Sequence, residues 1–588
     1  MEFRFIDDII NGVTLELNVL KRTTETYSTL LYQHEGVLAA SNQKIGNSLD
    51  ATLKLRSFFA LLKQTNSDLG LIPEYCCPFS SLNEILIDPQ NWPNPNKLWV
   101  IGAESIQKDE LTAFAGNLGE DVICHFDTRI LTGTKNFLDP LIYLFKAMKE
   151  GKEKLIVLVQ FKNFHMGVWS GGDIERDNMI PGNEIYILRN SKTSVHLMSV
   201  VCSEAMNLPS QMTPNVQNDL LWGDIPFLVL NPQVNPGPVH TCFLTFRNFV
   251  LSSQRTEIIG LNWNNVSKIG SEALLSSKFS RSGIYTRSSD VNFKNLARVK
   301  ENHKRGLYYF YYGTDRHAFL FNSGAHAFLF DNTSVNISNG VGPQQMRNGP
   351  HLLSTYVFDI DDNLQAVDEV SDCHISYLTS VGCHNAFLTD SENCVIEKEL
   401  LACISTGEIA DKSTKNWSEL NNIWSIKSTD NTEINRRITV AEDMDAESTR
   451  IRDKYAGLIE VLGTEILKNP TYIPDSLSDL RCEELILGYS KQRNVSHQRL
   501  VGLQYFRCNM TTLTGEMVWA TVCYLDMASD EKIGRVFEAL QGLFDYDSRN
   551  RDRVVVFYKR DGIYQAKSSE SSSSIKEVSA GKENSFLK

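Results

Sequence analysis

Several features that would assign this chain to a familiar class are missing from its 588 residues. No apolar run reaches the roughly 18 residues of a transmembrane helix. The first residues carry the acids Glu2, Asp7 and Asp8 and lack the apolar core of a secretory leader. A formal net charge of −13 does not favour a general nucleic-acid binder, which needs a dense basic surface. We therefore expect a cytoplasmic protein with neither a membrane nor a nucleic acid as partner.

Other absences narrow the chemistry. Twelve cysteines, scattered and mostly inside apolar runs, indicate reduced thiols rather than a disulfide framework. No glycine-rich phosphate loop, no Ser-His-Asp order and no paired-aspartate metal site stands out. With 42% hydrophobic and 22% charged residues, the chain can bury a large core and is long enough for two domains.

Short apolar runs alternate with helical patterns over the first half of the chain. The runs typical of strands span 36–41, 68–72, 98–102, 155–161, 196–201, 227–231 and 257–262. Helical segments are predicted at 53–62, 137–149 and 239–255. Strands that alternate with helices predict an α/β fold, in which a parallel or mixed sheet carries helices on its faces.

The pattern changes beyond about residue 280. The string His-Ala-Phe-Leu-Phe occurs at 317–321 and again at 326–330, separated by a glycine-containing turn, which predicts a β-hairpin. A polar stretch at 405–435 precedes a helical region at 441–468, and strand-like runs return at 517–525 and 554–558. The serine- and lysine-rich end of the chain is predicted to be disordered.

Three reactive side chains each follow an apolar strand. Glu74 follows the run that ends at Pro73, Lys162 follows Phe161, and Cys202 follows the run that ends at Val201. Strand ends can meet at one rim of a sheet although they are far apart in sequence. We therefore expect a carboxylate, an ammonium and a thiol to converge there as a catalytic set.

These three groups suit nucleophilic catalysis. A thiol attacks only as the thiolate, and a neighbouring base or cation favours that form. Glu74 would take the proton and later activate water. Lys162 would hold the thiolate and stabilise the oxyanion, with the backbone N–H of Ser203 as a second oxyanion donor. The product of the first step would be a thioester. The alternatives are a buried structural thiol at Cys202, a surface acid at Glu74 and a solvated lysine at Lys162.

The order Glu, Lys, Cys and the strings around it resemble the nitrilase, or carbon–nitrogen hydrolase, superfamily. Leu-Ile-Pro-Glu-Tyr at 71–75 is similar to the motif of the general base, Phe-Lys at 161–162 to the lysine motif, and Val-Val-Cys-Ser-Glu at 200–204 to the nucleophile motif. Glu175, followed by Pro181-Gly182, resembles the second glutamate, which helps to position lysine and substrate; its alternative is a solvated loop acid. Through this resemblance, Glu175, Ser203 and Glu204 are expected to position the substrate.

The resemblance covers about residues 33–335 and implies an αββα sandwich that pairs into a homodimer or larger homo-oligomer. It also implies hydrolysis of a small nonpeptide amide or nitrile without a cofactor. The expected division of the chain is an N-terminal extension at 1–32, a nitrilase-like hydrolase domain at 33–365, a mixed α+β interaction or assembly domain at 366–566, and a disordered tail at 567–588.

Three departures from the family pattern concern the substrate more than the fold. Ser203 stands where an aromatic residue is common, an insertion is expected around 127–140, and His165 stands one place late. Two other functions stay open. One is a catalytically weak scaffold or ligand sensor for assembly, as such domains also occur in bacterial antiviral systems. The other is acyl transfer to an amine.

A repeated Cys-His pair is a further candidate for chemistry. The pairs lie at 373–374 and 383–384. A zinc site needs about four convergent ligands, and two adjacent pairs cannot all point one way along a strand. We therefore interpret these residues as core residues without a metal.

Overall fold

The structure is a computed structural model of the chain. It describes residues 1–21, 26–166, 172–253, 255–270, 279–287, 296–312, 316–333, 350–370, 373–393, 395–408, 437–438, 446–490, 507–544 and 548–569. The chain divides into two compact units, the first comprising Met1–Phe310 and Thr314–Val370, the second Tyr311–Gly313 and Ser371–Lys588. No helix among the described residues is long and apolar enough to cross a membrane.

Two large sheets form the centre of the first unit. One has the strand order β21-β20-β19-β3-β6-β7-β9-β10-β8. Its strands are β3 (Thr26–Tyr32), β6 (Leu69–Cys77), β7 (Leu98–Ala103), β8 (Val122–Phe126), β9 (Pro140–Lys149), β10 (Lys152–Phe161), β19 (Ala327–Thr333), β20 (His351–Phe358) and β21 (Leu364–Val367), and the short β2 (Val13–Thr14) also pairs with β9. We call it the β6 sheet.

The other sheet has the order β1-β11-β12-β13-β14-β16-β18-β17. Its strands are β1 (Glu2–Phe5), β11 (Glu184–Leu188), β12 (His196–Ser199), β13 (Phe227–Pro232), β14 (Thr256–Leu261), β16 (Gly283–Arg287), β17 (Leu307–Tyr312) and β18 (Arg316–Phe321). We call it the β13 sheet. β12, β13 and β14 run parallel, so their carboxyl ends reach the same edge.

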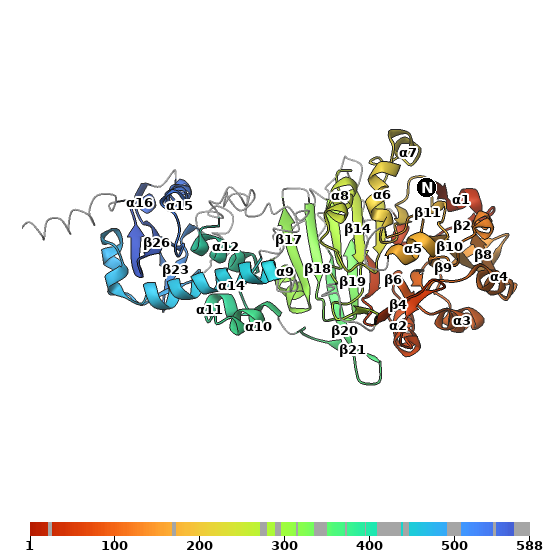
Figure 1. Cartoon of the computed structure of the whole chain (residues 1–588), viewed down its shortest axis with the longest axis horizontal. Helices are drawn as coiled ribbons and strands as arrows, with labels where there is room; N and C mark the ends of the chain where they lie inside the picture. Colours follow the sequence, from red (N-terminus) through yellow and green to blue (C-terminus); the bar gives the residue numbers. More distant parts are fainter. Residues whose placement is uncertain are drawn as a thin grey trace, which may run out of the picture. The chain divides into compact units, whose positions relative to one another are not determined.

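Helices cover the outer face of each sheet, and the inner faces meet. α2 (Thr52–Thr65) packs on the β6 sheet, where Phe59 stacks on Trp99 with ring centroids 5.6 Å apart. α8 (Thr241–Val250) packs on β14 and against α6 (Glu204–Gln211). Between the sheets, Gln160 of β10 donates to the Ser199 carbonyl of β12 at 3.0 Å. Figure 1 shows α6 and α8 on one side of this unit and α2 and α3 (Phe79–Ile87) on the opposite side. The predicted mixed α/β class is confirmed.

The helix predicted at 137–149 is wrong. Residues Pro140–Lys149 form β9, which pairs antiparallel with both β7 and β10. Most of its side chains are buried, on both faces of the strand, so the alternation that marks a half-buried strand is missing. Glu150 and Gly151, both with positive φ (52° and 79°), form the two-residue turn to β10, a hairpin signal that outweighs the apolar periodicity.

The predicted hairpin of the repeated string is also wrong. The first copy lies on β18 in the β13 sheet, and the second lies on β19 in the β6 sheet. The strands therefore face each other across the sandwich, with the Phe321 and Phe328 rings 4.9 Å apart. The Gln33 side-chain amide donates to the Asn322 and Ala325 carbonyls, which holds the connection that changes sheets. Each copy buries its aromatic residues in the shared core.

Residues 1–32, set apart in the sequence as an extension, supply β1 and β3 to the two sheets. β1 pairs with β11, and β3 lies between β6 and β19. The boundaries predicted for the domains stay a prediction, although the two units divide near the expected residue 365.

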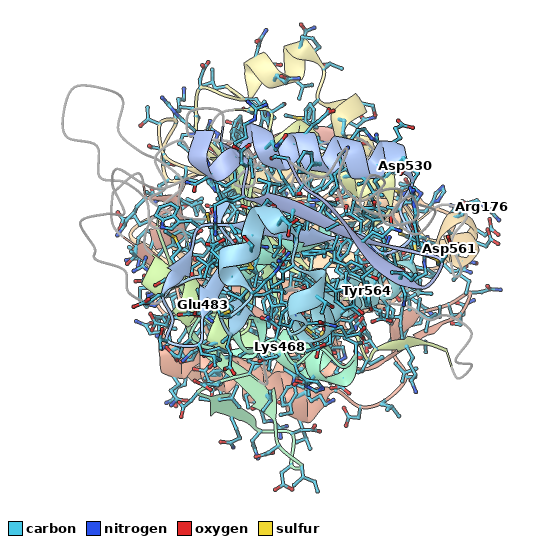
Figure 2. All side chains as sticks on the ribbon, turned by 90° about the vertical axis from the view of Figure 1, so that its left-hand side faces the viewer. Arg176, Lys468, Glu483, Asp530, Asp561 and Tyr564 are labelled. Atoms are coloured by element: carbon cyan, nitrogen blue, oxygen red, sulfur yellow. The ribbon has the colours of Figure 1, made fainter. Side chains whose placement is uncertain are left out.

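The described residues of the second unit form helices and two small sheets. Its main helices are α10 (Cys373–Ser380), α12 (Val395–Thr406), α14 (Ala446–Val461) and α15 (Asp530–Gly542); its sheets are β22-β23-β24 and β25-β26-β27. β25 (Thr521–Tyr524) and β26 (Val554–Arg560) correspond to the predicted runs. Figure 2 shows Tyr564, on β27 (Ile563–Lys567), and Asp530, at the start of α15. Tyr564 donates to Glu465, and Asp530 pairs with Arg560.

Some predictions for this half fall partly outside the described residues. These are the polar stretch, of which 409–435 is not described, and most of the tail, at 570–588. Of the two Cys-His pairs, Cys383 is buried, as the core interpretation requires, but His384 is exposed, so that interpretation is wrong for His384. The side chains of Cys373 and His374 lie outside the described set.

Candidate active site

The three reactive side chains come from both sheets and meet between them. Glu74 lies in β6, Lys162 directly follows β10, and Cys202 lies in the turn from β12 to α6. All three are buried, and Cys202 is only 1% exposed. The convergence expected from the sequence is therefore present in the geometry.

The Lys162 ammonium is the centre of the cluster. Its Nζ lies 2.6 Å from Glu74 Oε1 and 2.8 Å and 3.1 Å from the two carboxylate oxygens of Glu175. A third carboxyl group, that of Asp139, lies with its Oδ2 3.7 Å from the same nitrogen. Three carboxyl groups thus surround one buried cation. Charge-assisted hydrogen bonds of this kind hold a lysine side chain in one conformation.

A break in strand pairing presents Glu74. Ile72 pairs with Ile101 and Cys77 with Ala103, so the four residues 73–76 of β6 bulge opposite the single residue Gly102. Tyr75, in the bulge, has a positive φ of 53°. A Cβ on Gly102 would stand 2.1 Å from the Pro73 carbonyl oxygen, so the bulge fits only against glycine.

Neighbouring groups also fix the direction of the Glu74 carboxylate. Its Oε2 accepts a hydrogen bond from the Val234 backbone N–H at 2.8 Å, and its own backbone carbonyl accepts one from the Trp263 indole at 2.8 Å. Val234 and Trp263 follow β13 and β14, so the opposite sheet holds this residue of the β6 sheet in place.

Cys202 lies on a sharp turn. Its φ is 38°, a left-handed conformation that is unusual for a residue with a side chain and is found where structure around it enforces it. The Cys202 N–H donates to the Pro232 carbonyl at 2.9 Å, and its Sγ lies 3.8 Å from the Val234 carbonyl oxygen. Such a strand-to-helix turn places the Cys202 side chain at the edge of the β13 sheet, where it is buried.

Burial decides the protonation of the thiol and the acids. Burial, together with the Glu74 charge, raises the pKa of Cys202 well above its ordinary value, so the resting sulfur is a neutral thiol. Burial also raises the pKa of Glu74. The pKa of Asp139 lies well above its ordinary value because of burial, the Glu74 charge and a hydrogen bond to Glu74, so Asp139 carries the proton. Burial lowers the pKa of Lys162, but the Glu175 and Glu74 charges outweigh it and keep that pKa well above normal.

The three residues expected to position the substrate brace the site. Glu175 binds Lys162 and also accepts from the Tyr75 hydroxyl at 2.9 Å. The Ser203 hydroxyl donates to the Phe164 carbonyl at 2.7 Å. The Glu204 carboxylate accepts from the Val201 N–H at 2.6 Å and from the backbone and side-chain N–H groups of Asn163 at 2.6 and 2.7 Å. The side chains of Ser203 and Glu204 therefore link the turn of Cys202 to the segment after Lys162.

The carboxyl groups also meet the geometric criterion for a cation site. One oxygen each of Glu74, Asp139 and Glu175 lie within 4.8 Å of one another. The Lys162 ammonium lies within 2.6 to 3.7 Å of the same three groups, so a cation of the chain itself already balances them. We assign no metal to this cluster.

Asp139 and Tyr75 were not predicted as site residues. Asp139 falls in the segment expected to be an insertion, and it directly precedes β9, the strand that the sequence suggested was a helix. With 140–149 assigned as a strand, Asp139 stands at a strand end beside Lys162. The backbone N–H of Lys162 donates to the backbone carbonyl of Asp139 at 3.0 Å. Tyr75 follows the predicted base directly, but no spacing rule marks its hydroxyl.

Comparisons with known proteins give a partial match to one group. No family model matches the chain, and no curated protein matches it. Among solved structures, a CN-hydrolase superfamily protein from Xanthomonas campestris, with an arsenic adduct in its active site, is 11% identical, with a TM-score of 0.26 over 44% of this chain and 82% of its own. A nitrilase-superfamily amidase from Nesterenkonia is 13% identical, with a TM-score of 0.25 over 44% of this chain and 83% of its own. A variant of the Nesterenkonia amidase, with an acetamide group on its active-site cysteine, is 12% identical, with a TM-score of 0.27 over 45% and 84%.

Proposed function

We propose that this protein hydrolyses the carbon–nitrogen bond of a small nonpeptide amide or nitrile, with Cys202 as nucleophile. One observation carries the proposal. A thiol on a strained turn, a carboxylate with a raised pKa and an ammonium come from three distant strands of two sheets and meet in one buried cluster. Perturbed titratable groups gathered in this way favour a catalytic function over a structural one.

The first half of the proposed reaction forms a thioester. The Cys202 thiol transfers its proton to Glu74, and the sulfur attacks the carbonyl carbon of the amide. The negative charge that develops on the carbonyl oxygen is stabilised by the Lys162 ammonium and the Ser203 backbone N–H. The C–N bond then breaks, and the leaving nitrogen takes the proton back from Glu74. Because burial raises the pKa of Glu74, its carboxylate accepts a proton more readily than an ordinary glutamate and can later return it.

The second half releases the acid. Glu74 removes a proton from a water molecule that attacks the thioester, and the C–S bond breaks to return the thiol and a carboxylic acid. For a nitrile, the same attack gives a thioimidate, which water hydrolyses in turn. In this scheme Glu175 and Asp139 act by positioning Lys162 and Glu74. Ser203 and Glu204 act by fixing the geometry of the turn that carries Cys202.

The test is turnover of a panel of small amides and nitriles, followed as release of ammonia. Cys202→Ser and Glu74→Gln should each lower kcat/KM by about 10²-fold or more. Cys124→Ser removes a partly buried thiol of β8, outside the cluster, and should leave turnover unchanged. Turnover in Cys202→Ser equal to that of the unsubstituted protein would reject the assignment.

Complete burial of the three groups favours a second candidate, a scaffold or ligand sensor in which the cluster only stabilises the sandwich. Acyl transfer to an amine would use the same thioester and differs only in product. Intact mass spectrometry after incubation with substrate separates these possibilities. An acyl adduct on Cys202 in the Glu74→Gln variant supports catalysis, and product analysis then distinguishes water from an amine as acceptor. Homo-oligomerisation and a cytoplasmic location stay predictions.

A further inference from the structure

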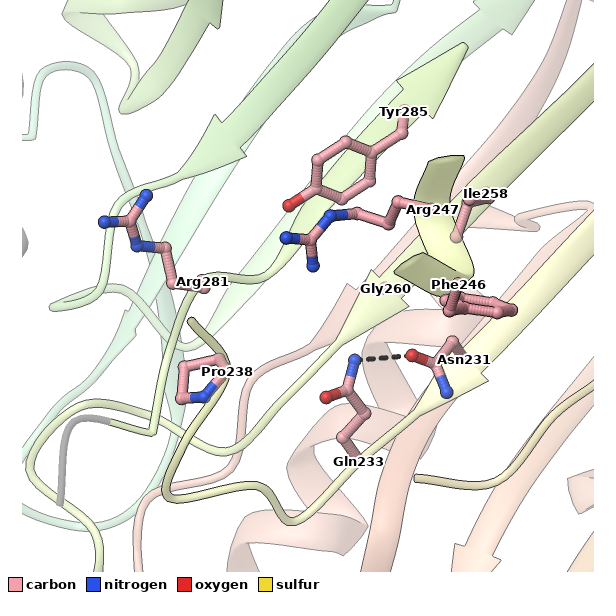
Figure 3. Close-up of a pocket in the computed structure, with 9 residues that line it drawn as sticks. All are labelled: Asn231, Gln233, Pro238, Phe246, Arg247, Ile258, Gly260, Arg281 and Tyr285. Carbon is pink, nitrogen blue, oxygen red and sulfur yellow. Dashed lines mark hydrogen bonds between the residues drawn. The ribbon is translucent and has the colours of Figure 1, made fainter. Parts of the chain in front are cut away.

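Three buried amide side chains lie along the end of β13. Asn231 belongs to the strand, and Gln233 and Asn235 follow it at intervals of two residues. The Gln233 N–H still donates to the Leu261 carbonyl of β14 at 2.8 Å, so the extended pairing continues past the strand. In extended backbone, residues at intervals of two share one side. Figure 3 shows the Asn231 and Gln233 side chains joined by a hydrogen bond.

These amides form a chain of hydrogen bonds that runs in one direction. Asn235 Nδ2 donates to Gln233 Oε1 at 2.8 Å, and Gln233 Nε2 donates to Asn231 Oδ1 at 2.6 Å. Asn231 Nδ2 then donates to the Val200 carbonyl at 2.5 Å. Each amide accepts with its oxygen and donates with its nitrogen, so the direction of the chain fixes the orientation of every member. The chain ends two residues before Cys202.

The other end of the chain is tied to the residues that hold Glu74. Asn262, directly after β14, donates its side-chain N–H to the Asn235 carbonyl at 2.8 Å and accepts from the Asn235 N–H at 2.9 Å. The next residue, Trp263, donates its indole N–H to the Glu74 carbonyl, and Val234 donates its backbone N–H to the Glu74 carboxylate. One network of buried amides therefore connects the segments that hold the proposed base to the turn of the proposed nucleophile.

We propose that Gln233 is a positioning residue, the central link of an amide chain that fixes Glu74 and Cys202 relative to each other. The inference rests on the proposed function, because this position affects turnover only if the two groups react. Loss of the Gln233 amide leaves a buried donor on Asn235 and a buried acceptor on Asn231 without a partner. Hydrogen bonds in such a buried chain reinforce one another, and a displacement of about 1 Å between reacting groups can cost roughly 10²-fold in rate.

The experiment compares Gln233→Met with the unsubstituted full chain. Methionine keeps the length of the side chain and removes both of its hydrogen bonds. Gln64→Met makes the same change at an exposed position of α2 and is the matched control. Gln233→Glu keeps the acceptor for Asn235 and is the milder variant if Gln233→Met does not fold. Two measurements are made, hydrogen–deuterium exchange read by mass spectrometry and steady-state hydrolysis of the amides that the unsubstituted protein accepts.

In Gln233→Met, we expect the backbone amides of 73–77 and 200–205 to exchange about tenfold faster or more, with kcat about tenfold lower and KM within about threefold. Gln64→Met should change neither. Unchanged exchange at both segments, faster exchange throughout the first unit, or an unchanged kcat would overturn the proposal. The exchange measurement needs no turnover. An unsubstituted protein that hydrolyses no amide would reject the proposed function and with it the catalytic effect of Gln233, while exchange still decides whether the chain links the two segments.

Discussion

Replacing Lys162 by methionine tests whether its ammonium is what keeps three buried carboxyl groups together. Methionine keeps the length of the side chain and removes its charge. Glu74 and Glu175 would then lose a cation at 2.6 and 2.8 Å while they remain buried. Removal of one partner of a buried ion pair costs about 3–5 kcal/mol. That is a large share of the roughly 5–15 kcal/mol by which a typical domain is stable.

The loss should also depend on pH. Without Lys162, the folded-state pKa of Glu74 rises further above its unfolded value, because burial and the Glu175 charge are no longer opposed by the ammonium. A group with a raised folded pKa contributes stability that is complete below its unfolded pKa and is lost as pH rises through the folded one. The unfolding free energy of Lys162→Met should therefore be closest to that of the unsubstituted protein near pH 5 and lower than it by pH 8.

Urea unfolding followed by tryptophan fluorescence measures both effects, since Trp99 and Trp263 are buried in the first unit. Adding Glu175→Gln to Lys162→Met removes one uncompensated carboxylate and should recover part of the lost stability at pH 8. Lys44→Met, which breaks a half-exposed pair with Glu104, should cost under about 1 kcal/mol. A Lys162→Met protein that unfolds within about 0.5 kcal/mol of the unsubstituted protein at every pH would refute the reasoning.

Three further changes test other parts of the site. Gly102→Ala forces a Cβ onto the backbone at Pro73 and should lower the unfolding free energy by about 1–3 kcal/mol. Gly116→Ala, where nothing lies within 4 Å, is the control and should not lower it; equal midpoints for Gly102→Ala and the unsubstituted protein would contradict the role of the bulge. Tyr75→Phe removes the hydrogen bond to Glu175 and should cost about 1 kcal/mol and lower kcat, whereas unchanged kinetics would show that this bond does not position Lys162. Glu204→Gln turns one acceptor oxygen into a donor against Val201 or Asn163, at a cost of about 1–3 kcal/mol in thermal or urea unfolding. Burial raises the pKa of Glu204 to about 7, so its contribution to the free energy of unfolding is lost as pH rises through that value. The difference in unfolding free energy between the unsubstituted protein and Glu204→Gln should therefore narrow there. A difference that stays constant with pH would contradict this.

The sequence pointed to Glu74, Lys162 and Cys202 because each follows a short apolar run, although β6 continues past Glu74 to Cys77. The runs before Glu74, Lys162 and Cys202 are apolar, short and bounded by residues that end strands, and the structure has strands at all three places. Periodicity failed at β9, since a strand buried on both faces has no period of two. That error also hid Asp139, because a residue inside the helix predicted at 137–149 is not expected at a sheet edge.

Pairing partners were harder to predict than strands. The repeat at 317–330 has the composition and the short glycine-containing turn of a hairpin, yet its two strands join different sheets. Nothing in the local sequence distinguishes these outcomes, because a hairpin and a connection between sheets bury the same aromatic residues. The difference depends on the distant Gln33, whose amide caps the carbonyls of the turn.

The relative position of Glu74 and Cys202 depends on how the two sheets pack against each other. Val234 donates its backbone N–H to Glu74, and its carbonyl lies beside the Cys202 sulfur. This single residue therefore contacts both the proposed base and the proposed nucleophile. Glu74 belongs to one sheet and Cys202 to the other, and the distance between them follows the packing of the inner faces. Substitutions in that inter-sheet core, such as at Phe321 or Phe328, should therefore change kcat without touching the reactive groups, because the core determines how the two halves of the site meet.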